Sequence, residues 1–288
     1  MTGWRSGNAG VCKTSTRGFD SRSGLPMKKT ALTLIFLFLL AFAPSARAQE
    51  FDFDKAYQDY IYTQTVYDQT YSEYDKAKNN YLKNPTLTLK EDARKKTQAM
   101  LVVRDELFRV YLSTIRMKLL EIKAPVDHGL DDEIAWYLNH KNVYKLDDPL
   151  DDLFGKSKES ESRLGSHTSP IAYESLFNIS FGEIGNIRVS HEGVYKSLKN
   201  SIDLGVSAGI LKLDPFNRWF TDIENVLKEL DVINTKSKTR MAKMYDSSTL
   251  APKSAFNGAI NELSPAAAKL TELNSFLTEL LNSIRAQL

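Results

Sequence analysis

Hydrophobic and polar residues follow a helical spacing over most of the chain after residue 50. In the segment from Phe51 to Leu82, aromatic residues recur every seven positions, and small residues occupy a second repeated position. This spacing places both sets on one side of a helix, where they can pack against a neighbouring helix. The repeated aromatic residues are Phe53, Tyr60, Tyr67, Tyr74 and Tyr81. We predict a long helix over residues 51–82 that ends at Asn84-Pro85, because proline disfavours helical geometry in the residue before it.

A second long helix is predicted over residues 88–123. Thr88 and Glu91 match a capping box, in which the threonine caps the first turn and the glutamate reaches back to it. Apolar residues again recur every seven positions, at Leu101, Phe108, Ile115 and Ile122. Because the connection between the two helices is short, they should form an antiparallel hairpin.

The middle of the chain, residues 126–168, has a weaker pattern. Short helices are predicted over residues 132–142 and 149–164, the second running into a polar segment. Residues 169–205 show helical spacing, but Phe177, Ile179 and Phe181 alternate with polar residues, and nearby glycines weaken a helix. We predict a helix with a kink near Gly182 to Gly185, with a β-hairpin over residues 177–189 as the alternative.

The clearest coiled-coil pattern follows Asp214-Pro215. Its first repeated position holds Phe216, Ile223, Leu230, Ser237 and Met244. A loop is expected over residues 247–258, and a last helix over residues 265–288. Four helix starts are predicted where Asp or Ser precedes proline, because such residues cap the first turn and proline tolerates its first position: Asp148-Pro149, Ser169-Pro170, Asp214-Pro215 and Ser264-Pro265. Gly205 is expected to terminate the preceding helix with a positive φ.

The predicted fold is therefore all-α: an elongated, coiled-coil-like helical bundle of long antiparallel helical hairpins with a less regular middle segment. The expected organisation is an N-terminal long helical hairpin over residues 49–125, an irregular middle with short helices over 126–168, and a C-terminal helical bundle over 169–288.

The segment that precedes residue 49 changes how the composition is interpreted. Residues 27–48 contain a basic pair, an apolar run and an Ala46-Arg47-Ala48 site, the order found in a secretory signal peptide. Cleavage is expected before Gln49, and the apolar run is shorter than the ~20 residues of a transmembrane helix. Residues 1–26 match either a start assigned too early, with translation from Met27, or an extended n-region. We expect an exported protein, periplasmic or extracellular, without a transmembrane segment after cleavage.

Without its leader the chain is acidic. Residues 1–48 carry seven basic residues and one acidic residue, so 31 basic and 35 acidic residues remain, a net charge of about −4 instead of +2. This balance argues against nucleic acid as a partner. The single cysteine, Cys12, also lies in the leader, so the exported chain has no disulfide and no cysteine-ligated metal.

The tyrosines of the first helix are the candidate partner-binding residues. A tyrosine ring can pack in a helical seam while its hydroxyl reaches solvent, and such a seam most often forms part of the molecule's own core. Some of these rings lie off the strict seam, however, and tyrosine is enriched in protein interfaces. The candidate residues are Tyr57, Tyr60, Tyr62, Tyr67, Tyr71 and Tyr74.

Catalytic and metal-binding motifs are weak. Gly205 to Gly209 matches the G-x-S-x-G pattern around Ser207, but no histidine follows it, as that motif requires. His191-Glu192 lacks the second histidine of a zinc protease motif. The basic set Lys236, Lys238, Arg240 and Lys243 is interpreted as one solvated helix face. No metal and no cofactor are expected.

Three functions follow from these patterns, in decreasing order of support. The first is an exported, non-catalytic structural or interaction protein of the cell envelope that docks other envelope or secreted proteins, or copies of itself, through its long helices. The second is an extracytoplasmic helical bundle that binds or senses a small ligand, with Tyr57, Tyr60, Trp136 and Trp219 around a pocket. The third is a hydrolase that uses Ser207.

Overall fold

The computed structural model describes residues 52–246 and 250–288, and in these ranges the chain is helical without strands, so the predicted all-α fold is confirmed. The predicted signal peptide, residues 27–48, and the segment 1–26 lie outside the described residues. Within the described ranges, no helix combines the length and the apolar composition that crossing a membrane requires.

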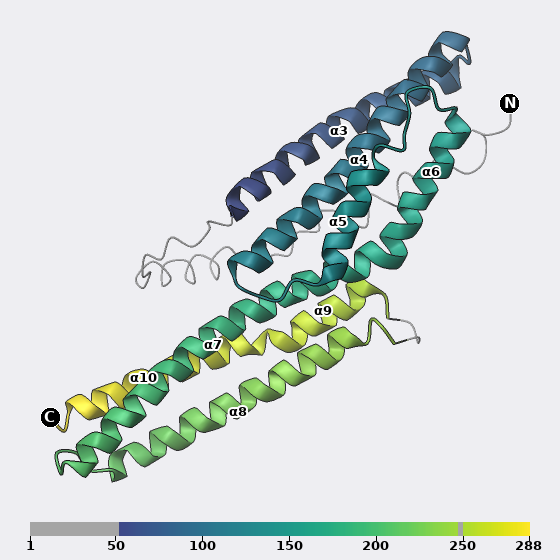
Figure 1. The fold of residues 1–288 in the computed structure, drawn as a ribbon. Coiled ribbons are helices and arrows are strands. Elements are labelled where there is room, and N and C mark those ends of the chain that lie inside the picture. Colours follow the sequence, from purple (N-terminus) through teal and green to yellow (C-terminus); the bar gives the residue numbers. More distant parts are fainter. Residues whose placement is uncertain (1–51, 247–249) are drawn as a thin grey trace.

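The predicted N-terminal hairpin is present. It consists of α3 (Phe53–Lys83) and α4 (Leu87–Glu121), which pack against each other along their lengths (Figure 1). The predicted capping box is wrong, because Thr86 caps α4 instead of Thr88: its side chain accepts a hydrogen bond from the Leu89 amide at 3.3 Å. The turn between the two helices covers residues 84–86 and is two residues shorter than predicted.

The middle segment is more ordered than the sequence indicated. It contains α5 (His128–His140) and α6 (Leu150–Arg163), and the polar segment after α6 is helical too. α5 begins four residues earlier than predicted, because the Asp127 side chain accepts a hydrogen bond from the Gly129 amide at 2.7 Å. A short π-helix, η1 (Leu164–Thr168), then leads directly into the next helix.

The longest helix, α7 (Ser169–Ser207), confirms the helix predicted over residues 169–205, excludes its β-hairpin alternative and begins without the predicted cap. It continues through Gly182 and Gly185, so the alternative β-hairpin is wrong. It also does not start with Ser169 as a cap, because Ser169 already has helical backbone angles and follows η1 without a break. A Cβ on Gly182 would lie 3.2 Å from Ile122 and Ala124, so this glycine allows the end of α4 to approach α7 closely.

The C-terminal helices pack beside the second half of α7. They are α8 (Asp214–Ala242), α9 (Pro252–Leu263) and α10 (Pro265–Arg285). The predicted α8 seam is buried at Phe216, Ile223, Leu230 and Ser237. The predicted loop over residues 247–258 is wrong in part, since α9 begins at Pro252 and buries Ala255 and Phe256.

Helix ends follow the predicted prolines better than the predicted caps. Pro149 precedes α6, and α7, α8 and α10 each have a proline in the first turn, but none of these four helices has a side-chain cap. Gly205 lies inside α7, and Gly209 instead takes the positive φ, of 71°, that terminates the helix. A Cβ on Gly205 would lie 2.8 Å from Cγ of Leu211, so this glycine makes room for a buried leucine.

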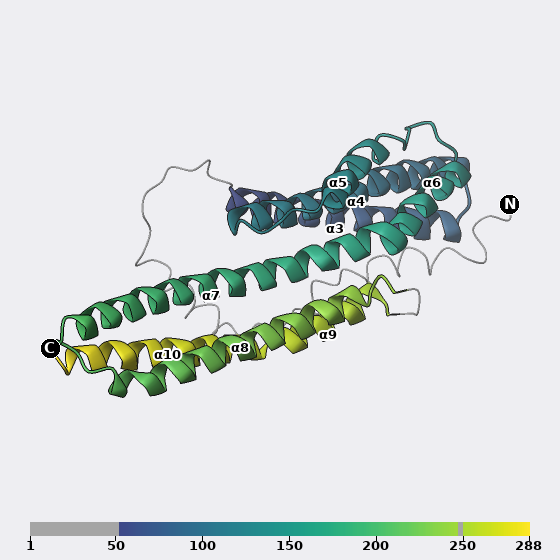
Figure 2. The same cartoon turned by 60° about the horizontal axis from the view of Figure 1, so that its bottom comes forward.

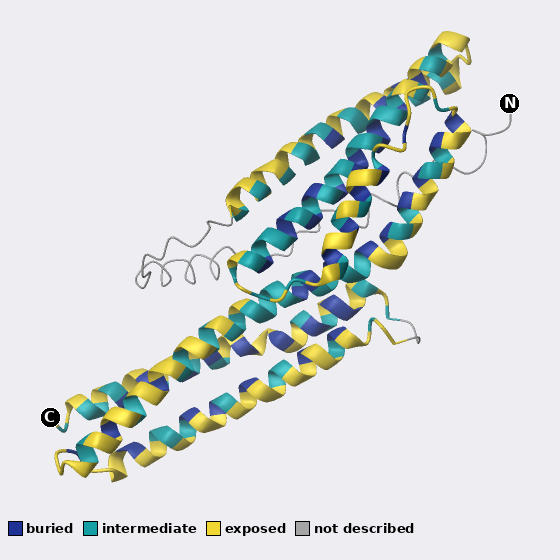
Figure 3. Cartoon of the chain, in the orientation of Figure 1, coloured by how far each residue is buried: buried dark blue, intermediate teal, exposed yellow. Residues whose placement is uncertain are grey.

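The molecule is an elongated pair of helical groups connected by α7 (Figures 1 and 2). One core lies among α7, α8, α9 and α10, and two smaller ones form around α4 with α3, α5, α6 and the start of α7. Buried residues form stripes along each helix, and α3 lies at the outer edge with its far side exposed (Figure 3). Because α7 contributes to the cores of both groups, it joins them through packed side chains.

Candidate functional site

Of the six candidate tyrosines, two are buried, two are half-buried and two are exposed. Tyr67 and Tyr74 are 7% and 2% exposed and pack with Met100 and Leu101 of α4 in one core cluster. Tyr71 lies between them, with ring centroids 6.0 Å from Tyr67 and 5.8 Å from Tyr74. These three rings therefore stabilise the α3–α4 hairpin.

The other three tyrosines lie near the start of α3. Tyr57 and Tyr62 are 45% and 71% exposed. Tyr60 is half-buried, and its ring lies 5.5 Å from that of Tyr111 on α4. Burial raises the pKa of Tyr60 above its ordinary 10.0. Among the six candidates, the two exposed rings therefore lie in the first three turns of α3, whereas Tyr60 and Tyr71 are half-buried.

A groove of about 270 Å³ separates the first turns of α3 from α4 on the side of Tyr62. Its polar wall is formed by Asp59, Glu106 and Arg109. Arg109 binds Glu106 with nitrogen–oxygen distances of 2.7 and 2.9 Å, and Lys141 reaches the same carboxylate at 2.7 Å. Burial alone would raise the pKa of Glu106, but these two cations lower it overall. The charges of this wall are largely paired within the molecule.

The structure does not bring together the four rings that the ligand-binding hypothesis placed around one pocket. Tyr57 and Tyr60 contact each other near the start of α3. Trp136 stacks on His140 in α5. The ring centroid of Trp219 lies 5.9 Å from that of Phe276 in the C-terminal group. A pocket of these four residues is therefore absent.

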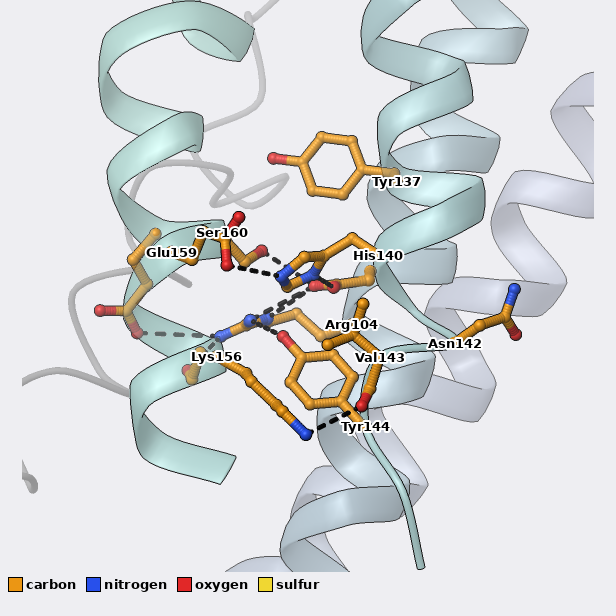
Figure 4. Close-up of polar contacts among 12 residues, drawn as sticks. Arg104, Tyr137, His140, Asn142, Val143, Tyr144, Lys156, Glu159 and Ser160 are labelled. Carbon is orange, nitrogen blue, oxygen red and sulfur yellow. Dashed lines mark hydrogen bonds and ion pairs between the residues drawn. The ribbon is translucent and has the colours of Figure 1, made fainter. Parts of the chain in front are cut away.

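Sequence reasoning missed a buried polar cluster at the centre of the N-terminal group (Figure 4). Arg104 and Asp105 of α4 are 3% and 0% exposed. The Arg104 guanidinium contacts the Asp105 carboxylate at 3.3 Å and donates to Ser157 Oγ at 3.0 Å and to the Tyr144 hydroxyl at 3.1 Å. Burial opposes the charged guanidinium, but Asp105 and the neighbouring oxygens outweigh it, and the pKa of Arg104 is raised.

Asp105 connects the three helices of this cluster. Its carboxylate accepts a hydrogen bond from Ser160 of α6 at 2.9 Å and lies 2.6 Å from His140 Nδ1 of α5. The carboxylate thus ties α4 to both short helices at once. The available sequence signal was the position of two charged residues between Leu101 and Phe108, where the seven-residue pattern expects the inner face of the helix.

The His140 imidazole is enclosed by other rings. Trp136 stacks on it with centroids 4.2 Å apart, and Tyr144 meets it edge-on at 5.2 Å. Its Nε2 atom is buried without a hydrogen bond, and the Glu159 carboxylate is 3.8 Å away. An Asp–His pair assists hydrolysis only when the second nitrogen faces a nucleophile. Here that nitrogen faces a carboxylate, so the pair has the geometry of a structural contact.

A second set of polar contacts extends the cluster toward η1. Glu133 is 2% exposed and binds the Arg163 guanidinium at 2.7 and 3.2 Å. Thr168 donates to the same carboxylate at 2.6 Å and lies 3.1 Å from the Tyr137 hydroxyl. These contacts fix the point where η1 continues into α7, which explains why a helix does not start afresh at Ser169.

Ser207 does not have the surroundings of a nucleophile. It lies in the last turn of α7, and its hydroxyl donates to the Asp203 carbonyl at 2.8 Å. His191 is 16 residues earlier on the same helix, a distance of about 24 Å along the axis. Across residues 52–246 and 250–288, no three or more His, Cys, Asp or Glu side chains are grouped to hold a metal ion.

In the N-terminal group, the exposed start of α3 and its adjoining groove are surfaces with potential for recognition, while the buried cluster positions the helices behind them. Comparison with known proteins adds no assignment: no family model, curated protein or solved structure matches this chain.

Proposed function

We propose that this protein is an exported, non-catalytic helical interaction protein of the cell envelope that docks a partner protein through the outer side of α3. The supporting observation is the exposure of three large apolar side chains in the first three turns of this helix. Tyr57, Ile61 and Tyr62 are 45%, 39% and 71% exposed. Exposed aromatic residues near charged ones are typical of protein interfaces.

The charge of this segment indicates the chemistry of the partner. From residue 52 to residue 75 the chain carries six carboxylates and a single lysine, Lys55. The acidic residues are Asp52, Asp54, Asp59, Asp68, Glu73 and Asp75. A partner surface with apolar and basic side chains, such as an amphipathic helix, would complement both properties.

The buried cluster around Asp105 is consistent with this role, because it fixes the helices against which α3 packs. α3 packs against α4, and α4 is held to α5 and α6 through Asp105. A rigid support lowers the entropy that is lost when a surface binds. The ligand-binding and hydrolase alternatives lack comparable support, because their candidate residues lie apart or in helical hydrogen bonds.

The test is crosslinking of the tagged protein in its native cells, followed by mass spectrometry of the proteins recovered with it. We expect a stoichiometric envelope protein whose crosslinks map to residues 53–68. Tyr62→Ala should abolish its recovery without changing the thermal unfolding of the purified protein. The matched control is Leu204→Ala, which removes a side chain of similar exposure, 73%, on α7. Recovery of a free monomer, or equal loss in both variants, would refute the docking proposal.

A further inference from the structure

A basic groove between α8 and α9 lies in the C-terminal group, away from the docking surface on α3. Its volume is about 260 Å³. It is lined by Thr235, Lys236, Thr239, Arg240, Lys243 and Glu262. The three cations are spaced by four and three residues, so they project from one side of α8.

These cations have few acidic neighbours along the chain. The chain carries four basic residues and no acidic residue between Asp231 and Asp246. Asp231, the acidic residue that precedes them, pairs with Arg188 at 2.6 Å instead. Glu262 lines the groove but forms no ion pair with them. The groove therefore has an excess of positive charge.

The Arg240 side chain packs against α9. It is half-buried, and its side chain crosses the backbone of α9 at Gly258. A Cβ on Gly258 would lie 3.1 Å from Cγ and 3.2 Å from Cζ of Arg240, and closer still to Nε. Any larger residue at position 258 would thus displace the guanidinium. A guanidinium presents several donors in one plane, which suits it to bind an anion.

We infer that this groove binds a phosphate monoester. A guanidinium and two lysines around one space match a dianionic phosphate better than a single carboxylate, because three cations can share its two charges. The Thr239 hydroxyl lies at the same wall and adds a neutral donor. The volume of the groove exceeds that of a phosphate group alone, which leaves room for part of an attached sugar or lipid headgroup.

This inference is independent of the docking function, since the groove lies on α8 and α9 and shares no residue with α3. The test is calorimetric titration of the purified full chain with inorganic phosphate and with glucose 1-phosphate, and flotation with vesicles of phosphatidic acid or of phosphatidylcholine alone. We expect binding of glucose 1-phosphate that weakens with added salt. Binding to phosphatidic acid vesicles alone would assign the lipid headgroup as the source of the phosphate.

Three variants separate a built site from diffuse charge. Arg240→Gln should weaken binding at least tenfold, because a charge-assisted hydrogen bond is lost. Gly258→Ala should weaken it similarly at unchanged net charge, because it displaces the guanidinium. Lys228→Gln removes one exposed cation of the same helix outside the groove and should have no effect.

Two outcomes would overturn the inference. If no phosphate compound and no vesicle binds, the cations serve only to stabilise the carboxyl end of α8. If Lys228→Gln and Arg240→Gln weaken binding equally, the attraction is that of overall charge. Lys236→Gln, which alters an exposed side chain, repeats the test if the other groove variants unfold.

Discussion

Asp105→Asn should destabilise the protein by about 3–5 kcal/mol, the usual cost of removing one partner of a buried ion pair. The carboxylate is 0% exposed and faces the Arg104 guanidinium at 3.3 Å, the Ser160 hydroxyl at 2.9 Å and His140 Nδ1 at 2.6 Å. An asparagine has the same shape but is neutral, and its NH₂ group would turn a donor toward at least one of these donors. The buried Arg104 charge would also keep only one carboxylate nearby, that of Glu161 at 3.8 Å.

The magnitude can be checked from the separate contacts. Hydrogen bonds that involve a charged group contribute about 1.5–3 kcal/mol each, and Asp105 forms contacts of this kind with three side chains. Loss of two of them already accounts for about 3 kcal/mol. Such a loss lowers the folding equilibrium constant by roughly two orders of magnitude.

The assay is urea unfolding followed by circular dichroism, with Asp92→Asn as the matched control. Asp92 lies on the same helix but is exposed, so the same chemical change should leave the unfolding midpoint unchanged. A double-mutant cycle with Arg104→Met should return a coupling energy of 1 kcal/mol or more, because the two residues share one network (about 0.5–3 kcal/mol for such pairs). A destabilisation of Asp105→Asn below about 1 kcal/mol would refute the reasoning that this cluster holds α4, α5 and α6 together.

Three further predictions concern stability. Burial raises the pKa of Tyr195 from 10.0 to about 12, and it raises the pKa values of Tyr137 and Tyr144 as well. As the pH rises, the unfolded chain loses these phenol protons before the folded chain does. The free energy of unfolding should therefore be constant below pH 10 and fall as the pH rises from 10 through about 12. A urea unfolding midpoint that does not change over this range would contradict the prediction. Lys123 lies two residues after the end of α4 and has a φ of 56°, which glycine adopts more easily than lysine. Lys123→Gly should therefore raise the free energy of unfolding by about 0.5–1 kcal/mol, as measured by urea unfolding. Gly185→Ala should stabilise the protein by about 0.5–1 kcal/mol, since a Cβ at this position meets no atom within 4 Å. Gly205→Ala should destabilise it by about 1–2 kcal/mol, because the Leu211 side chain must move. Equal melting temperatures for the two variants would refute the packing argument.

The long helices could be read from the sequence because their pattern is local and repeated. In α8 the residues at the first repeated position, Phe216, Ile223 and Leu230, are all fully buried. Because many apolar residues at regular positions favour the same buried helix face, one polar residue among them does not change which face is buried. The hairpin of α3 and α4 followed from the same pattern and a short turn.

Helix ends could not be fixed in this way. Thr86 and Thr88 are both reasonable caps, and they differ by about one hydrogen bond, which contributes ~1 kcal/mol. The chain continues as a helix through Ser169 because Thr168 is buried and bound to Glu133, a residue 35 positions away. Contacts between distant parts of the chain outweigh such small local preferences.

The sequence by itself determined the all-α class, the main amphipathic faces and the aromatic character of α3, because helical periodicity is set by neighbouring residues. Only the tertiary structure decided which tyrosines are core and which are exposed, and it alone revealed the cluster around Asp105 and the groove around Arg240. Two partners of Asp105, His140 and Ser160, lie 35 and 55 residues away, and Arg240 packs against Gly258 in another helix. No spacing along the chain encodes such contacts, because they form only when the packed faces of different helices meet.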